Sequence, residues 1–106
     1  MEENTAKKPR AHRKTMGKFI RRKVVFTVKA PAESKVCLAG SFNDWNPEAK
    51  VLKYNAEKDE FSGFLYLMPG KYEYKFVVDG VWQLDNANPN YVSNDMNSMN
   101  SIVEVQ

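Results

Sequence analysis

The segment from Lys71 to Val78 carries the clearest structural signal in the chain, because apolar and polar side chains alternate along it. One set of alternate positions holds Tyr72, Tyr74, Phe76 and Val78, and the other holds Lys71, Glu73, Lys75 and Val77. A period of two predicts a half-buried β-strand. The dipeptide Asp79-Gly80 follows at once and favours the two-residue turn of a β-hairpin, with a second strand at 81–84. The chain is therefore expected to fold into sheets.

Further short runs of this kind lie on both sides of the hairpin, each bounded by turn residues. We expect strands at 24–29, 35–39, 51–54, 61–67 and 102–105, and a long loop over the Asn-, Asp- and Ser-rich residues 85–100. About seven short strands without a helical period predict an all-β fold, an antiparallel β-sandwich. The residues expected to form its core are Phe26, Val28, Val36, Leu38, Phe42, Leu65, Leu67, Tyr74, Phe76 and Val103.

The charge of the chain is divided unevenly along its length. Residues 1–23 hold nine Lys and Arg against two Glu, a net charge of +7, whereas residues 24–106 hold seven Lys against eleven acids, a net charge of −4. The first segment also has few apolar side chains, so it cannot bury enough surface to offset the entropy of ordering. We therefore expect a basic, disordered arm at 1–21 and a single folded domain at 22–106.

The basic arm has more than one possible role. It can be a tether that holds a protein partner through residues 1–23, or it can contact nucleic acid or an anionic surface. No aromatic side chain precedes Phe19. The arm therefore offers few aromatic side chains on which bases could stack, and nucleic acid is the less favoured partner. No apolar run is long enough to span a membrane.

The residue types that catalysis and metal binding need are nearly missing. His12 is the only histidine and lies in the expected arm, and Cys37 is the only cysteine. Neither a Ser-His-Asp arrangement in the domain nor a zinc site can be assembled from them. The carboxylates in loops stand at expected turns, where Asp is favoured for its backbone geometry. We expect a binding protein without catalytic residues, metal or cofactor, in the cytoplasm because neither disulfides nor a signal segment are indicated.

The two tryptophans occupy unusual positions. Trp45 lies within GSFNDWNP (40–47), a run of turn residues that directly follows the expected strand at 35–39. On that segment alone, Trp45 can be a lid folded over the core or an exposed platform for a ligand. Trp82 comes just after the Asp79-Gly80 turn. Two indoles at strand ends therefore raise the possibility of a binding surface.

Carbohydrate is the ligand that this combination of side chains favours. Indole faces suit the apolar C–H faces of pyranose rings, and Lys75 and Asn100 add hydrogen-bonding groups for hydroxyls. Taken singly, Lys75 is more often a solvated strand lysine, and Asn100 is as readily a turn residue. The prediction of a sugar-binding surface rests on the four residues together.

Four segments, in order and spacing, resemble carbohydrate-binding module family 48. They are GSFNDWNP (40–47), LMPGKYEYKFVVDGVW (67–82), NANP (86–89) and NSIVEV (100–105). The resemblance covers about residues 22–106 and implies an immunoglobulin-like β-sandwich that binds α-1,4-linked glucans such as glycogen, starch or maltooligosaccharides. That family includes the glycogen-binding domain of the AMP-activated protein kinase β-subunit and the N-terminal domains of branching and debranching enzymes.

The resemblance also implies roles for individual residues. Trp45 and Trp82 match the stacking tryptophans of the family, Lys75 matches its strand lysine, and Asn100 matches its hydrogen-bonding asparagine. In the kinase subunits a Leu-Gly-Thr finger precedes that asparagine. Here the corresponding residues are Met96, Asn97 and Ser98, of which Met96 offers an apolar contact and Ser98 a hydroxyl.

The resemblance thus implies a non-catalytic α-glucan-binding module that brings a partner enzyme to glycogen. Two alternatives stay open at this point. The module can be a protein–protein domain of the same fold that has lost sugar binding, or the basic arm can make the chain a nucleic-acid binder.

Overall fold

The structure, a computed structural model, describes residues 20–106 and contains eight strands in two antiparallel sheets. The strands are β2 (Arg22–Val28), β3 (Val36–Gly40), β4 (Lys53–Asn55), β5 (Glu60–Leu67), β6 (Gly70–Val78), β7 (Val81–Gln83), β8 (Tyr91–Ser93) and β9 (Met99–Val105); a 3-10 helix, η3 (Ser41–Asn43), follows β3. The predicted all-β antiparallel sandwich is confirmed. The predicted arm at 1–21, apart from its last two residues, lies outside the described part of the chain, and so does His12.

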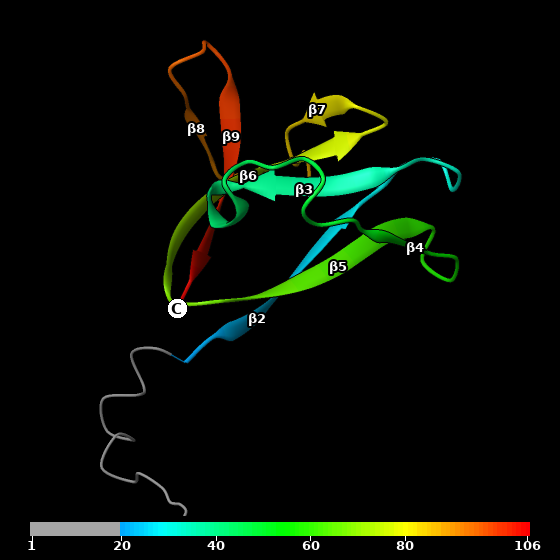
Figure 1. Cartoon of the computed structure of the whole chain (residues 1–106), viewed down its shortest axis with the longest axis horizontal. Helices are drawn as coiled ribbons and strands as arrows, with labels where there is room; N and C mark the ends of the chain where they lie inside the picture. The colour runs from blue at the N-terminus through cyan, green and yellow to red at the C-terminus, as the bar shows by residue number, and fades with distance from the viewer. Residues whose placement is uncertain (1–19) are drawn as a thin grey trace, which may run out of the picture.

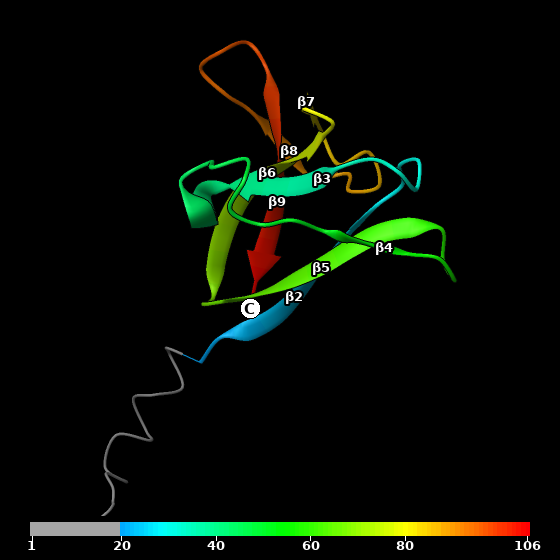
Figure 2. The same ribbon diagram turned by 45° about the vertical axis from the view of Figure 1, so that its right-hand side comes forward.

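The two sheets share the strands unequally. One sheet has three strands in the order β2-β5-β4, and the other has the order β3-β6-β9-β8, with β7 also paired to β6. Strand β6 therefore has β3 along one edge, while β9 and β7 divide its other edge. Figure 1 shows the two sheets as layers, with the β8–β9 hairpin rising beyond one of them. The turned view in Figure 2 shows the same projection of that hairpin.

The core lies between the two sheets. Phe26 of β2 and Phe61 of β5 meet Leu38 of β3 and Phe76 of β6, and none of the four side chains is more than 4% exposed. All ten predicted core residues are buried or half-buried. Leu52 also joins the core, because the chain at 50–52 runs beside β3 before it enters the other sheet as β4.

The hairpin predicted at Asp79-Gly80 is confirmed. Val78 pairs with Val81 across the turn, and the two turn residues have φ angles of 49° and 83°. Positive φ at both positions is the geometry that matches the twist of the flanking strands. The predicted loop at 85–100 is wrong in part, because β8 forms inside it, and β9 begins at Met99, three residues before the predicted start at 102.

A buried polar network connects β6 to the chain that leaves β7. The Tyr74 hydroxyl donates to Asp85 Oδ2 over 2.6 Å and accepts from Asn88 Nδ2 over 3.0 Å. Asn88 Nδ2 also donates to the Ile102 carbonyl, and the Asp85 amide donates to Ser101 Oγ. These bonds fasten the 85–88 segment to β6 and β9, so the position of β7 is fixed at its exit.

This network predicts a loss of stability in alkali. Burial raises the pKa of Tyr74, and the hydrogen bond to Asp85 raises it further. The folded state therefore keeps a proton that the unfolded state releases above a pH of about 10. The stabilisation is complete below that pH and is lost as the pH rises toward the folded-state pKa, with a slope of up to about 1.4 kcal/mol per pH unit.

Urea unfolding of wild type and Tyr74→Phe, each at a pH of about 8 and about 11, measures this slope. We expect Tyr74→Phe to cost about 1–2 kcal/mol near neutrality, because two partners lose their bond, and to flatten the alkaline slope. Tyr91→Phe is the matched control, because it removes an exposed phenol that takes no part in this network. An equal slope in wild type and Tyr74→Phe would show that this phenol does not carry the effect.

Candidate functional site

One cavity of about 440 Å³ lies on the outer side of the five-stranded sheet, at the end from which the β8–β9 hairpin rises. Its walls contain all six predicted site residues and one that the sequence did not suggest. The lining residues are Trp45, Lys75, Trp82, Asn94, Met96, Ser98 and Asn100. Residues up to 55 positions apart in the sequence, from Trp45 to Asn100, are thus brought to one place.

Strand register explains why three of these residues share a face. Lys75 of β6 pairs with Ala39, and the next outward position, Val77, pairs with Trp82. Directly paired residues point to the same side of a sheet, and alternate residues along a strand do so as well. Lys75 and Trp82 therefore both face away from the core. Asn100 shares that face because its neighbour Ser101 pairs with Tyr74 on the core side.

The loop that carries Trp45 is held by side-chain bonds to its own backbone. Asn43 Oδ1 accepts from the Gly40 amide over 3.0 Å, and Asn43 Nδ2 donates to the Leu38 carbonyl over 3.1 Å. The Trp45 amide closes the turn by donating to the Gly40 carbonyl over 2.9 Å. Phe42 anchors the loop, because its ring packs on the core with its centroid 5.9 Å from that of Phe26. The turn is thus rigid around the indole.

Trp45 covers part of the sheet and also lines the cavity. One side of its ring covers Cys37, Ala39 and Val77, three buried residues on the outer face of the sheet. The ring also lines the cavity. The predicted lid is therefore present, and the predicted role as a platform for a ligand stays a prediction.

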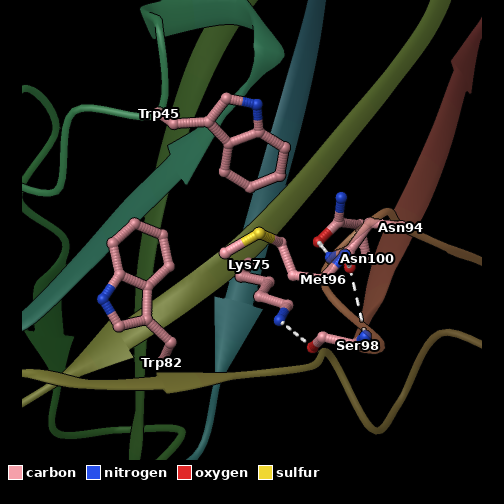
Figure 3. A pocket seen from close by; sticks show the side chains of 7 residues that line it. All are labelled: Trp45, Lys75, Trp82, Asn94, Met96, Ser98 and Asn100. Atoms are coloured by element: carbon pink, nitrogen blue, oxygen red, sulfur yellow. Dashed lines mark hydrogen bonds between the residues drawn. The ribbon is translucent and has the colours of Figure 1, made fainter.

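The two indoles form a shallow angled wall. Their ring centroids lie 6.5 Å apart, and their planes are tilted by 39°. Trp82 is 44% exposed, a large fraction for an aromatic side chain of this size. Figure 3 shows both rings on one side of the cavity, with the amide, hydroxyl and ammonium groups on the other.

The opposite wall is a chain of hydrogen bonds. Lys75 Nζ donates to Ser98 Oγ over 2.7 Å, and Asn94 Nδ2 donates to Asn100 Oδ1 over 3.2 Å. Asn100 is only 7% exposed, so its amide is fixed by its neighbours. Lys75 has two further N–H groups, and Asn100 has one more N–H beyond the one that it donates to Glu73. Unused donors therefore remain for a ligand.

The loop between β8 and β9 forms the rim of this wall. Asn94 Oδ1 accepts from the amides of Met96 and Ser98, over 2.8 and 3.1 Å. Asn97 has a φ of 59°, a left-handed conformation that Asn tolerates better than most residues. The turn therefore holds this backbone conformation without a glycine. The Met96 side chain is 83% exposed and reaches over the cavity (Figure 3).

The polar groups of the cavity are amides, one hydroxyl and one ammonium, besides the two indole N–H groups. The cavity residues include no carboxylate, histidine or cysteine that could act as a base or nucleophile beside a substrate. Over residues 20–106, no three His, Cys, Asp or Glu come together in a way that could hold a metal ion. In the same part of the chain, no helix has the length and apolar character needed to cross a membrane.

Asn94 is the cavity residue that sequence reasoning missed. It stands in an Asn-rich segment that reads as a loop, and nothing in its spacing separates it from Asn86, Asn88 or Asn90. Its place in the cavity depends on the pairing of β8 with β9. A three-residue segment of Tyr, Val and Ser is too short to predict that pairing. A predicted hairpin with its turn at 94–98 would have placed Asn94 opposite Asn100 and so among the site residues.

Comparison with known proteins shows the family of this chain. Residues 23–106 match the family model described as the glycogen recognition site of AMP-activated protein kinase. Protein PTST homolog 2, chloroplastic, from Arabidopsis thaliana is 50% identical over 56 residues, which are 53% of this chain and 10% of that protein. Protein FLOURY ENDOSPERM 6, chloroplastic, from Oryza sativa subsp. japonica is 41% identical over 73 residues, 69% of this chain and 13% of that protein.

A third relative is the 5′-AMP-activated protein kinase subunit beta-1 of Rattus norvegicus, 32% identical over 90 residues, 74% of this chain and 32% of the subunit. The chain thus spans about a third or less of these three proteins. The family model, in contrast, covers nearly all of the described residues. This chain therefore belongs to the family of the glycogen recognition site of AMP-activated protein kinase.

Proposed function

We propose that this domain binds α-1,4-linked glucans without acting on them, through the cavity between the two tryptophans and the β8–β9 loop. The observation that carries the proposal is the pair of indoles, tilted by 39° and facing a wall of hydrogen-bonding groups in one cavity. An α-1,4-linked glucan curves along its length, so two stacking surfaces at an angle suit it better than a flat pair. A recognition role also agrees with the family.

Trp45 and Trp82 are the stacking surfaces in this proposal. Pyranose rings present apolar C–H faces, and indoles are the largest apolar surfaces that a side chain offers. The backbone at Trp45 supports the assignment, because its φ is 57° and the preceding Asp44 has a φ of 56°. A left-handed tryptophan costs on the order of 1 kcal/mol or more, a strain that a glycine would avoid. We infer that the indole is needed at this position.

The other cavity residues supply polar and apolar contacts to the sugar. Lys75 and Asn100 donate hydrogen bonds to hydroxyls, and Ser98 offers its own hydroxyl beside Lys75. Met96 covers the ligand from the rim with a flexible apolar side chain. Asn94 acts chiefly by holding the loop, because both of its side-chain ends are already engaged within the protein.

A role in bringing a partner enzyme to glycogen extends this proposal to the rest of the molecule. The predicted partner-binding segment at 1–23 lies mostly outside the described residues and stays a prediction. The predicted cytoplasmic location also stays a prediction, and two plant relatives are named as chloroplastic. Nucleic-acid binding would show a steep salt dependence that disappears when residues 1–23 are deleted.

Titration of the protein with β-cyclodextrin and maltoheptaose, followed by tryptophan fluorescence, tests the proposed function. We expect saturable binding with a Kd of about 1 mM or tighter for both α-1,4-linked ligands. Cellohexaose, whose β-1,4 linkages make a flat ribbon, should bind at least about tenfold more weakly because it cannot follow the angled indoles. A wild-type protein that fails to bind either α-1,4-linked ligand would favour a protein–protein domain that has lost sugar binding.

A further inference from the structure

Glu73 contacts a cavity residue but does not itself line the cavity. It occupies the outer face of β6, two residues before Lys75, and pairs with Ile102 of β9. Its side-chain Oε1 accepts a hydrogen bond from Asn100 Nδ2 over 2.9 Å. The Glu73 side chain is half-buried and that of Asn100 is buried, so this contact is partly shielded from water. The carboxylate therefore touches a cavity residue without lining the cavity itself.

A carboxylate can only accept hydrogen bonds, and this property orients the amide of Asn100. The Nδ2 end must face Glu73, which leaves Oδ1 to face Asn94. Asn94 must then present Nδ2 to Asn100, which directs its own Oδ1 at the loop. That oxygen accepts from the backbone amides of Met96 and Ser98. One acceptor on β6 thus fixes the direction of every bond up to the loop tip.

Reversal of the amides would break this chain at each step. With Asn100 turned over, Oδ1 would meet the Glu73 carboxylate, and two acceptors without a proton repel each other. Nδ2 of Asn100 would then meet Nδ2 of Asn94, unless Asn94 also turned over and so took its Oδ1 away from the loop amides. Lys75 to Ser98 would remain as the side-chain bond between strand β6 and the loop. The directions of the hydrogen bonds in the closed loop therefore depend on an acceptor at position 73.

We propose that Glu73 is a positioning residue for glucan recognition: it orients Asn100 toward the sugar and, through Asn94, holds the loop of Met96 and Ser98 closed before the ligand arrives. The inference rests on the proposed function of the cavity, and it adds how the polar wall is preorganised. Preorganisation saves the ordering of loop and side chains on binding, so it contributes to affinity without a contact to the ligand.

The first test needs no sugar. Backbone amide exchange, measured by NMR on the free protein, reports the bonds from Met96 and Ser98 to Asn94. In Glu73→Ala we expect both amides to exchange about three- to tenfold faster, in line with the loss of one hydrogen bond. Glu73→Gln keeps a carbonyl acceptor and should remain near the wild-type rates, a rescue that a role of the negative charge would not give.

Glu104 provides a matched control on the same face of the same sheet. It pairs with Lys71, carries the same carboxylate and has no hydrogen bond to the loop at 94–98 among the described residues. Glu104→Ala should leave the exchange of Met96 and Ser98 unchanged. Equal exchange in wild type and Glu73→Ala, or equal acceleration by Glu104→Ala, would overturn the positioning role.

The second test measures affinity for β-cyclodextrin. Glu73→Ala is expected to raise the Kd about three- to tenfold, whereas Glu73→Gln and Glu104→Ala should stay within about twofold of wild type. A wild-type protein that does not bind at all would refute the proposed function of the cavity. The amide-exchange experiment would then still decide whether Glu73 holds the loop at 94–98. Normal wild-type binding with an unchanged Kd in Glu73→Ala would refute the positioning role alone.

Discussion

Trp82→Ala is expected to weaken binding of β-cyclodextrin by about thirtyfold or more, a loss of about 2 kcal/mol. The indole is 44% exposed and faces the cavity from β7, a strand whose three residues are all exposed. Its removal takes away one of two stacking surfaces and leaves Trp45 alone opposite the polar wall. Isothermal titration calorimetry measures the change directly, because the loss of a tryptophan complicates fluorescence.

The fold should survive this substitution. Trp82 belongs to neither of the two buried clusters, so we expect the free energy of unfolding to change by less than about 1 kcal/mol. Tyr66→Ala is the matched control, because Tyr66 is also a strand aromatic, is 56% exposed and belongs to the other sheet. Binding that is intact in Trp82→Ala, or equally impaired in Tyr66→Ala, would contradict the role given to the indole pair.

The strands with strong alternation were predictable because burial of one face requires apolar residues at every second position. In β6, Tyr74, Phe76 and Val78 face the core, as the period of two indicates. Val77 points the other way and yet is only 6% exposed, because Trp45 covers it. An apolar residue such as Val77 on the otherwise polar face of a strand indicates that another part of the chain covers that face. Trp45, whose position in a turn was unexplained, is the residue that covers it.

The β8–β9 hairpin could not be predicted from local pattern. Tyr91, Val92 and Ser93 are a weak three-residue signal inside sixteen residues rich in turn formers, and β8 exists because β9 pairs with it. The polar wall has the same cause, since Asn94 and Asn100 meet only when that hairpin forms. Pairing between strands is a tertiary effect that overrides local preference.

The family resemblance gave the positions of the expected site residues. The structure adds the backbone and side-chain geometry at those positions. Asn97 shows the difference clearly, because the family resemblance notes only that a glycine is replaced. The φ of 59° at Asn97 shows that the turn keeps a left-handed residue, and Asn supplies it with a side chain in place of Gly. What the loop requires is a backbone conformation, and two residue types can meet that requirement.

Gly40→Ala is expected to destabilise the domain by about 3 kcal/mol, and thereby to lower Tm by about 15 °C. A Cβ at this position would lie 2.5 Å from the Glu73 carbonyl oxygen and 2.6 Å from Cζ of Phe42. Neither neighbour can easily move, because Glu73 belongs to the central strand β6 and Phe42 packs on the core. The Gly40 carbonyl also accepts the bond that closes the Trp45 turn. Thermal and urea unfolding measure the loss.

Gly63→Ala separates this effect from the general replacement of a strand glycine. The nearest atom to its added Cβ is Leu52 Cδ2 at 2.6 Å, the end of a flexible side chain, and no backbone atom lies closer than 3.9 Å. We expect Gly63→Ala to change the free energy of unfolding by less than about 1 kcal/mol, because that methyl group can turn aside. Equal destabilisation by the two variants would mean that crowding of side chains alone limits both sites. A larger loss at Gly40 would show that the close approach of its backbone to β6 is what sets the Trp45 loop against the sheet.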